Sequence, residues 1–318
     1  MNFFYGLSRR LNHKYIKICS FLKLNLSKLK LNKNTFFILT LFFSLSSFFL
    51  EKNLINFNSH FLDNKTFIHF INVGQGDAIL INNENYNILI DSGSNDSSDY
   101  LTSYLKTFKI KKLDYIIATH PHEDHIGSMD DIINNFHVDN LIAPNISSSD
   151  IDFVNMVKAL NHKNLKINVI EDSTTINLLN NNYLTFLWSG NIATDNINNN
   201  SLVVKYINQD ISFLFTGDIE KEVEAQLQSI NEPLLDSDIL KVAHHGSNSS
   251  STSNFLSAVS PNISIITCGL GNNYGHPHKN TLTNLSNINS SIYRTDINGN
   301  ILMKTDGYKL WINTEYDN

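Results

Sequence analysis

The segment 119–125, T-H-P-H-E-D-H, restricts what this chain can fold into more than any other stretch of its sequence. Three histidines and two carboxylates lie within six consecutive positions, directly after a largely apolar run at 113–118. A run of that length, rich in β-branched and aromatic residues, predicts a buried strand. The residues from Ile126 onward predict an amphipathic helix. The cluster is therefore expected on a loop between a strand and a helix, where functional groups are commonly displayed.

The residue types in this loop predict a metal site. Neutral imidazole nitrogens and carboxylate oxygens are common ligands of Zn²⁺ and similar ions, and crowding them together without a cation is costly. A solvated loop that is rich in histidine by chance is the alternative, and the H-x-H-x-D-H spacing argues against it. The two cysteines are too far apart in the sequence to support a thiolate site. The expected ligands are His120, His122, Asp124 and His125, with others from further strand ends.

Two later segments can complete such a site. Asp218 follows an apolar run at 211–215, and its alternative role is the N-cap of a helix predicted at 219–230, which is favoured if this residue is taken alone. His244 and His245 follow a predicted buried strand at 239–243. Paired histidines at a strand end are uncommon as packing residues, so we favour a functional role for this pair.

The pattern over 67–318 predicts one mixed α/β domain. Strands are predicted at 67–71, 78–81, 87–90, 113–118, 138–142, 165–170, 239–243 and 263–268, with antiparallel strands of a second sheet at 183–188, 201–207 and 211–215. Helices are predicted at 99–108, 151–161, 219–230 and 254–259.

The N-terminal part has a different character. Residues 1–34 form a basic tail with eight Lys and Arg residues and no acidic one, so that, with a formal net charge of −6 for the whole chain, the remainder carries −14. Residues 35–50 are uncharged and apolar, which is short for a membrane span of roughly 20 residues. A basic flank before such a run is typical of an N-terminus retained in the cytoplasm. We interpret 35–50 as a transmembrane signal anchor, with a cleaved signal peptide as the alternative, and 51–66 as a linker.

Taken together, the motifs resemble the metallo-β-lactamase fold superfamily. The matching segments are I-D-S-G at 90–93, T-H-P-H-E-D-H at 119–125, T-G-D at 216–218 and the histidines at 244–245. A finer resemblance, to the extracellular metallo-hydrolase domain of ComEC/Rec2 competence proteins, rests on V-G-Q-G-D-A at 73–78, N-N-N-S-L-V at 198–203, L-K-V-A-H-H-G-S at 240–247 and Y-G-H-P-H at 274–278. The resemblance covers about 67–312.

This resemblance implies a four-layer αββα sandwich with two divalent ions, Zn²⁺ or Mn²⁺, at one edge between the sheets. His120 and His122 would hold one ion, and Asp124 and His125 the second. Asp218 would bridge both, and either His244 or His245 would complete the second ion. Two such ions activate water and stabilise the entering and leaving oxygens of a phosphodiester. Asp91 would orient a ligand histidine by a hydrogen bond.

One departure from the superfamily pattern concerns the first ion. Many members supply another histidine between the first cluster and the bridging aspartate, and here only His137 and His162 lie in that interval, neither at a predicted strand end. Residues 198–201 occupy the expected place. We therefore expect open positions on the first ion, filled by water or substrate, and an exchangeable metal such as Mn²⁺ then fits as well as Zn²⁺.

Four further residues are placed near the mouth of the site by the resemblance: Gln75, Asp77, His276 and His278. Gln75 and Asp77 would support the ligands. His276 and His278 would act with Asp124 in catalysis, by contact with substrate or by proton donation to the leaving group. A surface turn flanked by proline is the alternative for the two histidines.

These observations predict a metal-dependent phosphodiesterase or nuclease that acts on DNA outside the cytoplasmic membrane, either anchored there or secreted. A surface esterase for phosphorylcholine or another envelope phosphodiester is the alternative. A non-catalytic interaction module stabilised by metal ranks last. The acidic body lacks the basic surface expected of tight nucleic-acid binding. β-Lactam hydrolysis is disfavoured because fold membership does not set the substrate.

Overall fold

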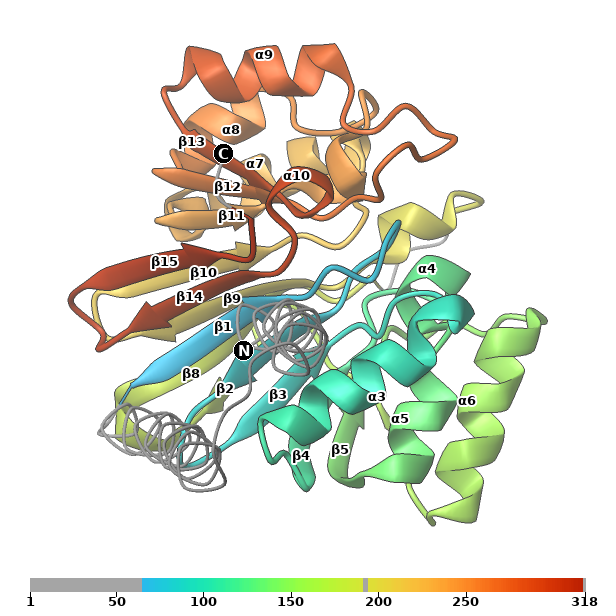
Figure 1. Ribbon diagram of the computed structural model, residues 1–318. Coiled ribbons are helices and arrows are strands. Elements are labelled where there is room, and N and C mark those ends of the chain that lie inside the picture. The colour runs from blue at the N-terminus through green and yellow to red at the C-terminus, as the bar shows by residue number, and fades with distance from the viewer. Residues whose placement is uncertain (1–64, 191–193, 317–318) are drawn as a thin grey trace, which may run out of the picture. The chain divides into compact units, whose positions relative to one another are not determined.

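The computed structural model describes residues 65–190 and 194–316, and all of these from Thr66 onward belong to one compact unit, Thr66–Asn318. Two mixed sheets pack face to face, and helices cover the outer face of each (Figure 1). The predicted four-layer αββα sandwich is therefore confirmed. No helix among the described residues is long and apolar enough to cross a bilayer. The basic tail, the apolar run at 35–50 and the linker to residue 64 lie outside those residues.

The first sheet contains, within the described residues, eight strands in the order β15-β14-β1-β2-β3-β4-β5-β6. Their bounds are β1 Thr66–Phe70, β2 Ile79–Asn82, β3 Asn87–Ile90, β4 Lys112–Ile117, β5 His137–Ile142, β6 Ile167–Asn168, β14 Ile301–Thr305 and β15 Leu310–Thr314. The second sheet has, in the same described part, seven strands in the order β13-β12-β11-β10-β9-β8-β7. These are β7 Thr175–Asn177, β8 Asn182–Trp188, β9 Val203–Asn208, β10 Ile211–Phe215, β11 Ile239–Lys241, β12 Ile263–Ile266 and β13 Ser291–Arg294.

Alternating side chains of the strands fill two different layers of the core. Ile79 and Ile81 of β2 lie between the sheets with Phe213 and Phe215 of β10. Leu80, between the two isoleucines, instead faces the helices that cover the first sheet. Because both faces of the strand are buried, its sequence is continuously apolar instead of alternating with polar residues.

Helices complete the outer layers. On the first sheet lie α3 (Ser98–Thr107), α5 (Met129–Asn135) and α6 (Ile151–His162), whose apolar residues share one core cluster with β2 and β3. On the second sheet lie α7 (Lys221–Leu235), α8 (Ser253–Val259) and α9 (Lys279–Asn287), which pack against β10, β11 and β12. Short helices α4 (Glu123–Ile126) and α10 (Thr295–Asn298) lie in connections.

Strand direction explains where the polar clusters meet. β3, β4 and β5 are parallel neighbours in the first sheet, and β10 and β11 are parallel neighbours in the second. Segments that leave the carboxyl ends of parallel strands emerge at the same edge of a sheet. The loops that carry residues 119–125, 216–218 and 242–246 therefore converge at one edge of the sandwich.

Three local predictions differ from the structure. The helix expected from Ile126 begins earlier as α4, so Asp124 and His125 lie in a helical turn instead of an open loop. The strand expected at 165–170 is reduced to β6, Ile167–Asn168. The strand expected at 239–243 ends at Lys241 and continues into a 3₁₀ turn, η4 (Ala243–Gly246), where both histidines have positive φ, 50° for His244 and 52° for His245.

Candidate metal centre

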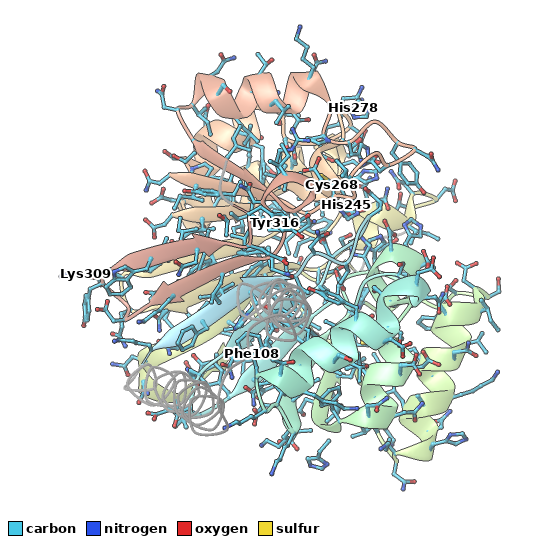
Figure 2. All side chains as sticks on the ribbon, in the orientation of Figure 1. Phe108, His245, Cys268, His278, Lys309 and Tyr316 are labelled. Carbon is cyan, nitrogen blue, oxygen red and sulfur yellow. The ribbon has the colours of Figure 1, made fainter. Side chains whose placement is uncertain are left out.

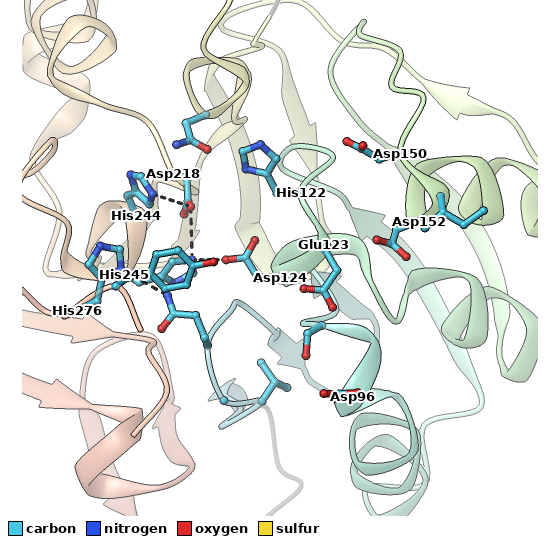
Figure 3. Close-up of a pocket in the computed structure, with 17 residues that line it drawn as sticks. Asp96, His122, Glu123, Asp124, Asp150, Asp152, Asp218, His244, His245 and His276 are labelled. Carbon is cyan, nitrogen blue, oxygen red and sulfur yellow. Dashed lines mark hydrogen bonds and ion pairs between the residues drawn. The ribbon is translucent and has the colours of Figure 1, made fainter. Parts of the chain in front are cut away.

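An open pocket of about 860 Å³ lies at the edge where these loops converge. Asp124, Asp218, His244, His245 and His276 line one part of it, as Figure 3 shows. The side chains come from α4, from the segment before α7, from η4 and from the loop before α9. Asp124 and His276, which are 152 positions apart in the sequence, thus share one cavity.

Four side chains in this region form a donor set suited to a metal ion: Asp124, His125, Asp218 and His245. One ligand atom from each lies within 4.8 Å of the others. His245 Nε2 is 3.2 Å from Asp124 Oδ2 and 3.4 Å from Asp218 Oδ2. His125 Nε2 is 3.3 Å from Asp218 Oδ1. Asp218 thus presents one carboxylate oxygen to His125 and the other to His245.

The burial of these atoms tests whether a cation fits. His125 Nε2, Asp218 Oδ1 and His245 Nε2 are buried, and none makes a hydrogen bond of regular geometry beyond the ion-pair contacts given above. Buried polar atoms are rarely left without one, because each costs about 1–3 kcal/mol. One divalent cation among them would satisfy all three, so the donor set fits a metal ion.

The electrostatics of the site also favour positive charge. Burial alone would lower the pKa of His125, but Asp218, Asp91 and Asp124 outweigh it and hold this pKa well above the usual range. Burial acts in the same direction on His245, where Asp218, Asp124 and Asp77 again raise the pKa well above the usual range. Both rings lie among carboxylates that attract positive charge, which a divalent metal ion would supply in place of the ring protons.

The far nitrogen of each histidine is held by the surrounding protein. His125 Nδ1 donates to Asp91 Oδ2 at 2.7 Å, and Asp91 also accepts the Thr119 amide at 2.8 Å. His245 Nδ1 donates to the Thr267 carbonyl at 2.8 Å. Each Nδ1 therefore keeps its proton, and each Nε2 would present a lone pair once a metal ion replaces the proton that the carboxylates favour there. Asp91 is thus in contact with a ligand histidine, the position implied for it by sequence.

His120 and His122 form a second pair of donors. His120 Nε2 and His122 Nδ1 face each other at 3.0 Å, and the His120 ring lies 4.2 Å from that of His125 between centroids. Burial lowers the pKa of His120 well below its usual value, so this ring is neutral and able to bind a metal. The two nitrogens are thus within hydrogen-bond distance of each other, and His120 lies beside His125 of the first donor set.

The structure separates the roles of the paired histidines. His245 is fully buried and belongs to the four-residue donor set. His244 has a side chain 22% exposed, with Nε2 3.8 Å from Asp218 Oδ2 and Nδ1 3.4 Å from Glu220 Oε1. His245 is therefore the member of the pair that meets Asp124. Asp218 precedes α7, whose N-cap is Glu220, so Asp218 is not the helix cap.

A buried ion pair beneath the donors was not anticipated from sequence. The Lys241 ammonium is fully buried, pairs with the Asp77 carboxylate and lies 3.8 Å from Asp218 Oδ1. Burial would raise the pKa of Asp77, but Lys241 and the neighbouring histidines together hold it below its usual value. The signal in the sequence was a lysine inside the apolar run at 239–243.

Asp77 lies beside two of the donor histidines and not in the wall of the pocket. It is 1% exposed, with Oδ1 3.5 Å from His245 Nδ1 and Oδ2 3.9 Å from His125 Nδ1. Its amide donates to the Asp124 carbonyl at 3.1 Å. Gly76, with φ of 136°, allows this approach, because a Cβ there would collide with the same carbonyl.

The remaining predicted residues divide between the pocket and its surroundings. Gln75 and His276 line the pocket, with Gln75 Nε2 3.4 Å from His276 Nδ1. His278 does not line it. That residue caps the N-terminus of α9 and accepts the Asn248 amide at 3.1 Å, which places it apart from His245 (Figure 2). His137 and His162, at the start of β5 and the end of α6, are exposed and also outside the pocket.

The opposite wall of the pocket is acidic, which sequence analysis missed. It carries Asp96, Glu123, Asp150 and Asp152, and no lysine or arginine is among the described residues that line the pocket (Figure 3). Asn95 holds two of these carboxylates, through its amide to Glu123 at 2.9 Å and its side chain to Asp152 at 2.9 Å. These residues come from three separate segments of the chain, so nothing in their local pattern indicated a shared wall.

Comparison with known proteins supports the assignment of this pocket as a metal centre. A family model described as the metallo-beta-lactamase superfamily matches residues 71–269. ComE operon protein 3 of Bacillus subtilis (strain 168) is 29% identical over 254 residues, which cover 74% of this chain and 32% of that protein. Recombination protein 2 of Haemophilus influenzae is 27% identical over 239 residues, covering 73% and 28%. The chain spans about a third of the length of these curated relatives.

A solved structure shares the architecture. The metallo-beta-lactamase fold protein YhfI from Bacillus subtilis matches with a TM-score of 0.50 and 14% sequence identity, covering 78% of this chain and 100% of that one. At this identity the likeness concerns the fold alone.

Proposed function

The chain belongs to the metallo-beta-lactamase superfamily, and from that premise we propose that it is a two-metal phosphodiesterase. The family match and the buried His/Asp cluster confirm the predicted class of metallo-hydrolase. The observation that carries the proposal is the pair of buried donor side chains Asp218 and His245 that line one pocket, with His125 Nε2 3.3 Å from Asp218 Oδ1.

The residues of the chain divide the work in this proposal. Divalent ions held by the two donor groups would activate water and neutralise charge on the phosphodiester oxygens. Asp218, within the first donor group, holds His125 and His245 by contacts of 3.3 and 3.4 Å. Asp91 and the Thr267 carbonyl hold His125 and His245 in the ligating tautomer. Lys241 balances the negative charge of Asp77 and Asp218 from below.

His276 is suited to contact substrate as a neutral ring. Burial and the nearby rings of His245, His244 and His278 lower its pKa to about 4. At neutral pH this imidazole carries one proton, so it can donate a hydrogen bond to a phosphate oxygen but holds no extra proton for a leaving group. Proton donation by His278 would require a route through His276, since His278 is outside the pocket.

DNA is the first candidate substrate. Relatives that carry the names ComE operon protein 3, Competence protein ComA and Recombination protein 2 support it, although each is about three times as long as the matched part. With the apolar run at 35–50 as an anchor, we place the reaction outside the cytoplasmic membrane.

A second candidate is favoured by the acidic wall. Asp96, Glu123, Asp150 and Asp152 would repel a polyanion but attract a cationic group next to the scissile phosphate. Tyr274, 65% exposed and also lining the pocket, offers an aromatic face to such a cation. An envelope phosphodiester of the phosphorylcholine type has this chemistry.

One assay series tests the proposal and separates the candidates. The purified chain is assayed with Mn²⁺ or Zn²⁺ on bis-(p-nitrophenyl) phosphate, single-stranded DNA and p-nitrophenyl phosphorylcholine. We expect hydrolysis of the first, and the preference between the other two identifies the substrate class. Asp218→Ala should abolish turnover, while Asp210→Ala, an exposed aspartate in the β9–β10 turn, should not. A metal-loaded protein that cleaves none of the three would refute the proposal.

A further inference from the structure

We propose that the amide oxygen of Asn198 and Nε2 of His244 are donors to the metal ion held by His120 and His122, and that Glu220 orients both. This inference rests on the metal centre of the proposed function and not on its substrate. It replaces the expectation that water or substrate fills the open positions of that ion.

The first observation is an unsatisfied oxygen. Asn198 is 9% exposed, lines the pocket together with His122, Asp218 and His244, and its Oδ1 has no hydrogen-bond partner. A buried carbonyl oxygen without a partner costs about 1–3 kcal/mol. Of the five buried orphan atoms among the described residues, three belong to the donor set above, and Asn198 Oδ1 is a fourth that borders the same pocket.

The segment that carries Asn198 is bonded both to the loop of His120 and to the segment of Asp218. This segment forms the 3₁₀ turn η3 (Ile197–Asn200). Beyond that turn, the Leu202 amide donates to the Thr119 carbonyl at 3.0 Å, next to His120. Ser201 Oγ accepts the Asp218 amide at 3.0 Å. The turn is therefore tied on one side to the loop of the first histidines and on the other to the shared aspartate.

The third observation fixes the orientation of the amide. Asn198 Nδ2 lies 3.4 Å from Glu220 Oε1. An ionised carboxylate accepts hydrogen bonds and donates none, so the NH₂ group must face Glu220 and the oxygen must point away from it. Glu220 is itself held in place, because its Oε2 accepts from Asn196 at 2.9 Å and its amide donates to Asn199 Oδ1 at 2.9 Å.

The same carboxylate orients His244. Glu220 Oε1 is 3.4 Å from His244 Nδ1, and Ser249 Oγ is 3.2 Å from that nitrogen. Acceptors at Nδ1 leave Nε2 with a lone pair, and this atom lies 3.8 Å from Asp218 Oδ2. In a regular strand, consecutive side chains point to opposite faces. The positive φ of His244 and His245 instead lets both rings line one pocket.

An amide oxygen in place of an imidazole nitrogen changes which metal ion the site prefers. An oxygen donor suits harder ions such as Mn²⁺ better than a nitrogen donor does. The site of His120 and His122 should therefore prefer Mn²⁺ more strongly than a site with a further histidine in place of Asn198.

The test measures binding of Mn²⁺ and of Zn²⁺ to the full chain, by calorimetric titration and electron paramagnetic resonance, independently of turnover. We expect two ions per chain. Asn198→Leu, which keeps the volume and removes the oxygen, should weaken one of them about tenfold or more and leave the other unchanged. Glu220→Gln should weaken the same ion about threefold to tenfold. Asn134→Leu, on the exposed face of α5, is the matched control and should bind both ions as the wild type does.

A second variant keeps the test decisive if Asn198→Leu does not fold. Asn198→His should shift the ratio of Zn²⁺ to Mn²⁺ affinity of that ion by about tenfold toward Zn²⁺. Unchanged affinities in the Asn198 variants, or a wild type that binds fewer than two ions, would overturn the inference. A wild type that binds two ions in this way but hydrolyses no phosphodiester would refute the proposed function and leave this inference standing.

Discussion

The Lys241 ammonium pairs with the Asp77 carboxylate directly beneath the metal donors, and neither side chain reaches solvent. The two residues come from different sheets, because Lys241 ends β11 and Asp77 precedes β2. Burial opposes the charge on Lys241, but Asp77 and Asp218 outweigh it and raise its pKa. The pair therefore joins the two sheets at the edge where the site lies.

Removal of one partner should be costly for stability. Lys241→Met leaves Asp77 buried without its cation, and we expect a loss of about 3–5 kcal/mol in the free energy of unfolding. Urea denaturation followed by circular dichroism measures this. Lys309→Met, at an exposed position of the β14–β15 turn, is the matched control. A loss below about 1 kcal/mol for Lys241→Met would show that the pair is not structural.

Loss of the hydrogen bond to His125 should weaken metal binding. Asp91→Asn can still accept the Thr119 amide but no longer offers a charged partner to His125 Nδ1. We expect the affinity for one metal ion to fall about 10–100-fold with the fold retained. Calorimetric titration with Mn²⁺ checks this. Asp99→Asn, at an exposed position of α3, is the matched control. Equal affinities in the two variants would contradict the role of Asp91.

Metal removal should lower thermal stability. A bound ion would satisfy the buried atoms of His125, Asp218 and His245 only in the folded state. A ligand at 100 times its Kd stabilises the fold by about 2.7 kcal/mol. We therefore expect Tm to rise with metal concentration in the wild type and to respond much less in Asp218→Ala. A wild-type Tm that is the same in chelator and in excess Mn²⁺ or Zn²⁺ would count against the centre.

The pH dependence of stability should show the buried Glu224 of α7. Burial raises its pKa from 4.5 to about 6, although it accepts the Ser251 and Thr252 amides. The folded state therefore binds this proton more tightly than the unfolded state does. The resulting stability, about 2 kcal/mol, is present below pH 4.5 and is lost as the pH rises through 6.

Denaturation of metal-free protein at pH 4 and pH 7.5 measures this effect. The unfolding free energy of the wild type minus that of Glu224→Gln should fall by up to about 2 kcal/mol between pH 4 and pH 7.5. Glu222→Gln, exposed on the same helix, should show no such change. A pH-independent difference for Glu224→Gln would contradict the assignment.

The acidic wall should influence substrate choice. Asp96→Asn combined with Asp150→Asn removes two charges that face the pocket. We expect kcat/KM on single-stranded DNA to rise about threefold to tenfold at low salt, and kcat/KM on p-nitrophenyl phosphorylcholine to fall. The pair Asp99→Asn and Asp210→Asn makes the same change in net charge away from the pocket. Equal effects of both pairs would attribute the change to net charge.

Much of the fold was predictable because buried strands carry an unmistakable local pattern. The runs that became β2, β3, β4 and β10 are largely apolar, and each lies where the sequence placed a strand. The form of α4 and β6 was less predictable from the sequence. A short helical turn at a metal loop and a two-residue edge strand depend on neighbours more than on their own residues.

The sequence by itself determined the types of ligand and their places after strands, since histidine and aspartate at the ends of apolar runs are visible without a fold. Only the tertiary structure decided which atoms meet. It selected His245 over His244 for the buried donor set, joined Lys241 to Asp77 and brought Asn198 to the pocket. The physical reason is that strand periodicity is encoded within a few residues, whereas the direction of a side chain at a strand end depends on backbone turns and partners more than a hundred positions away.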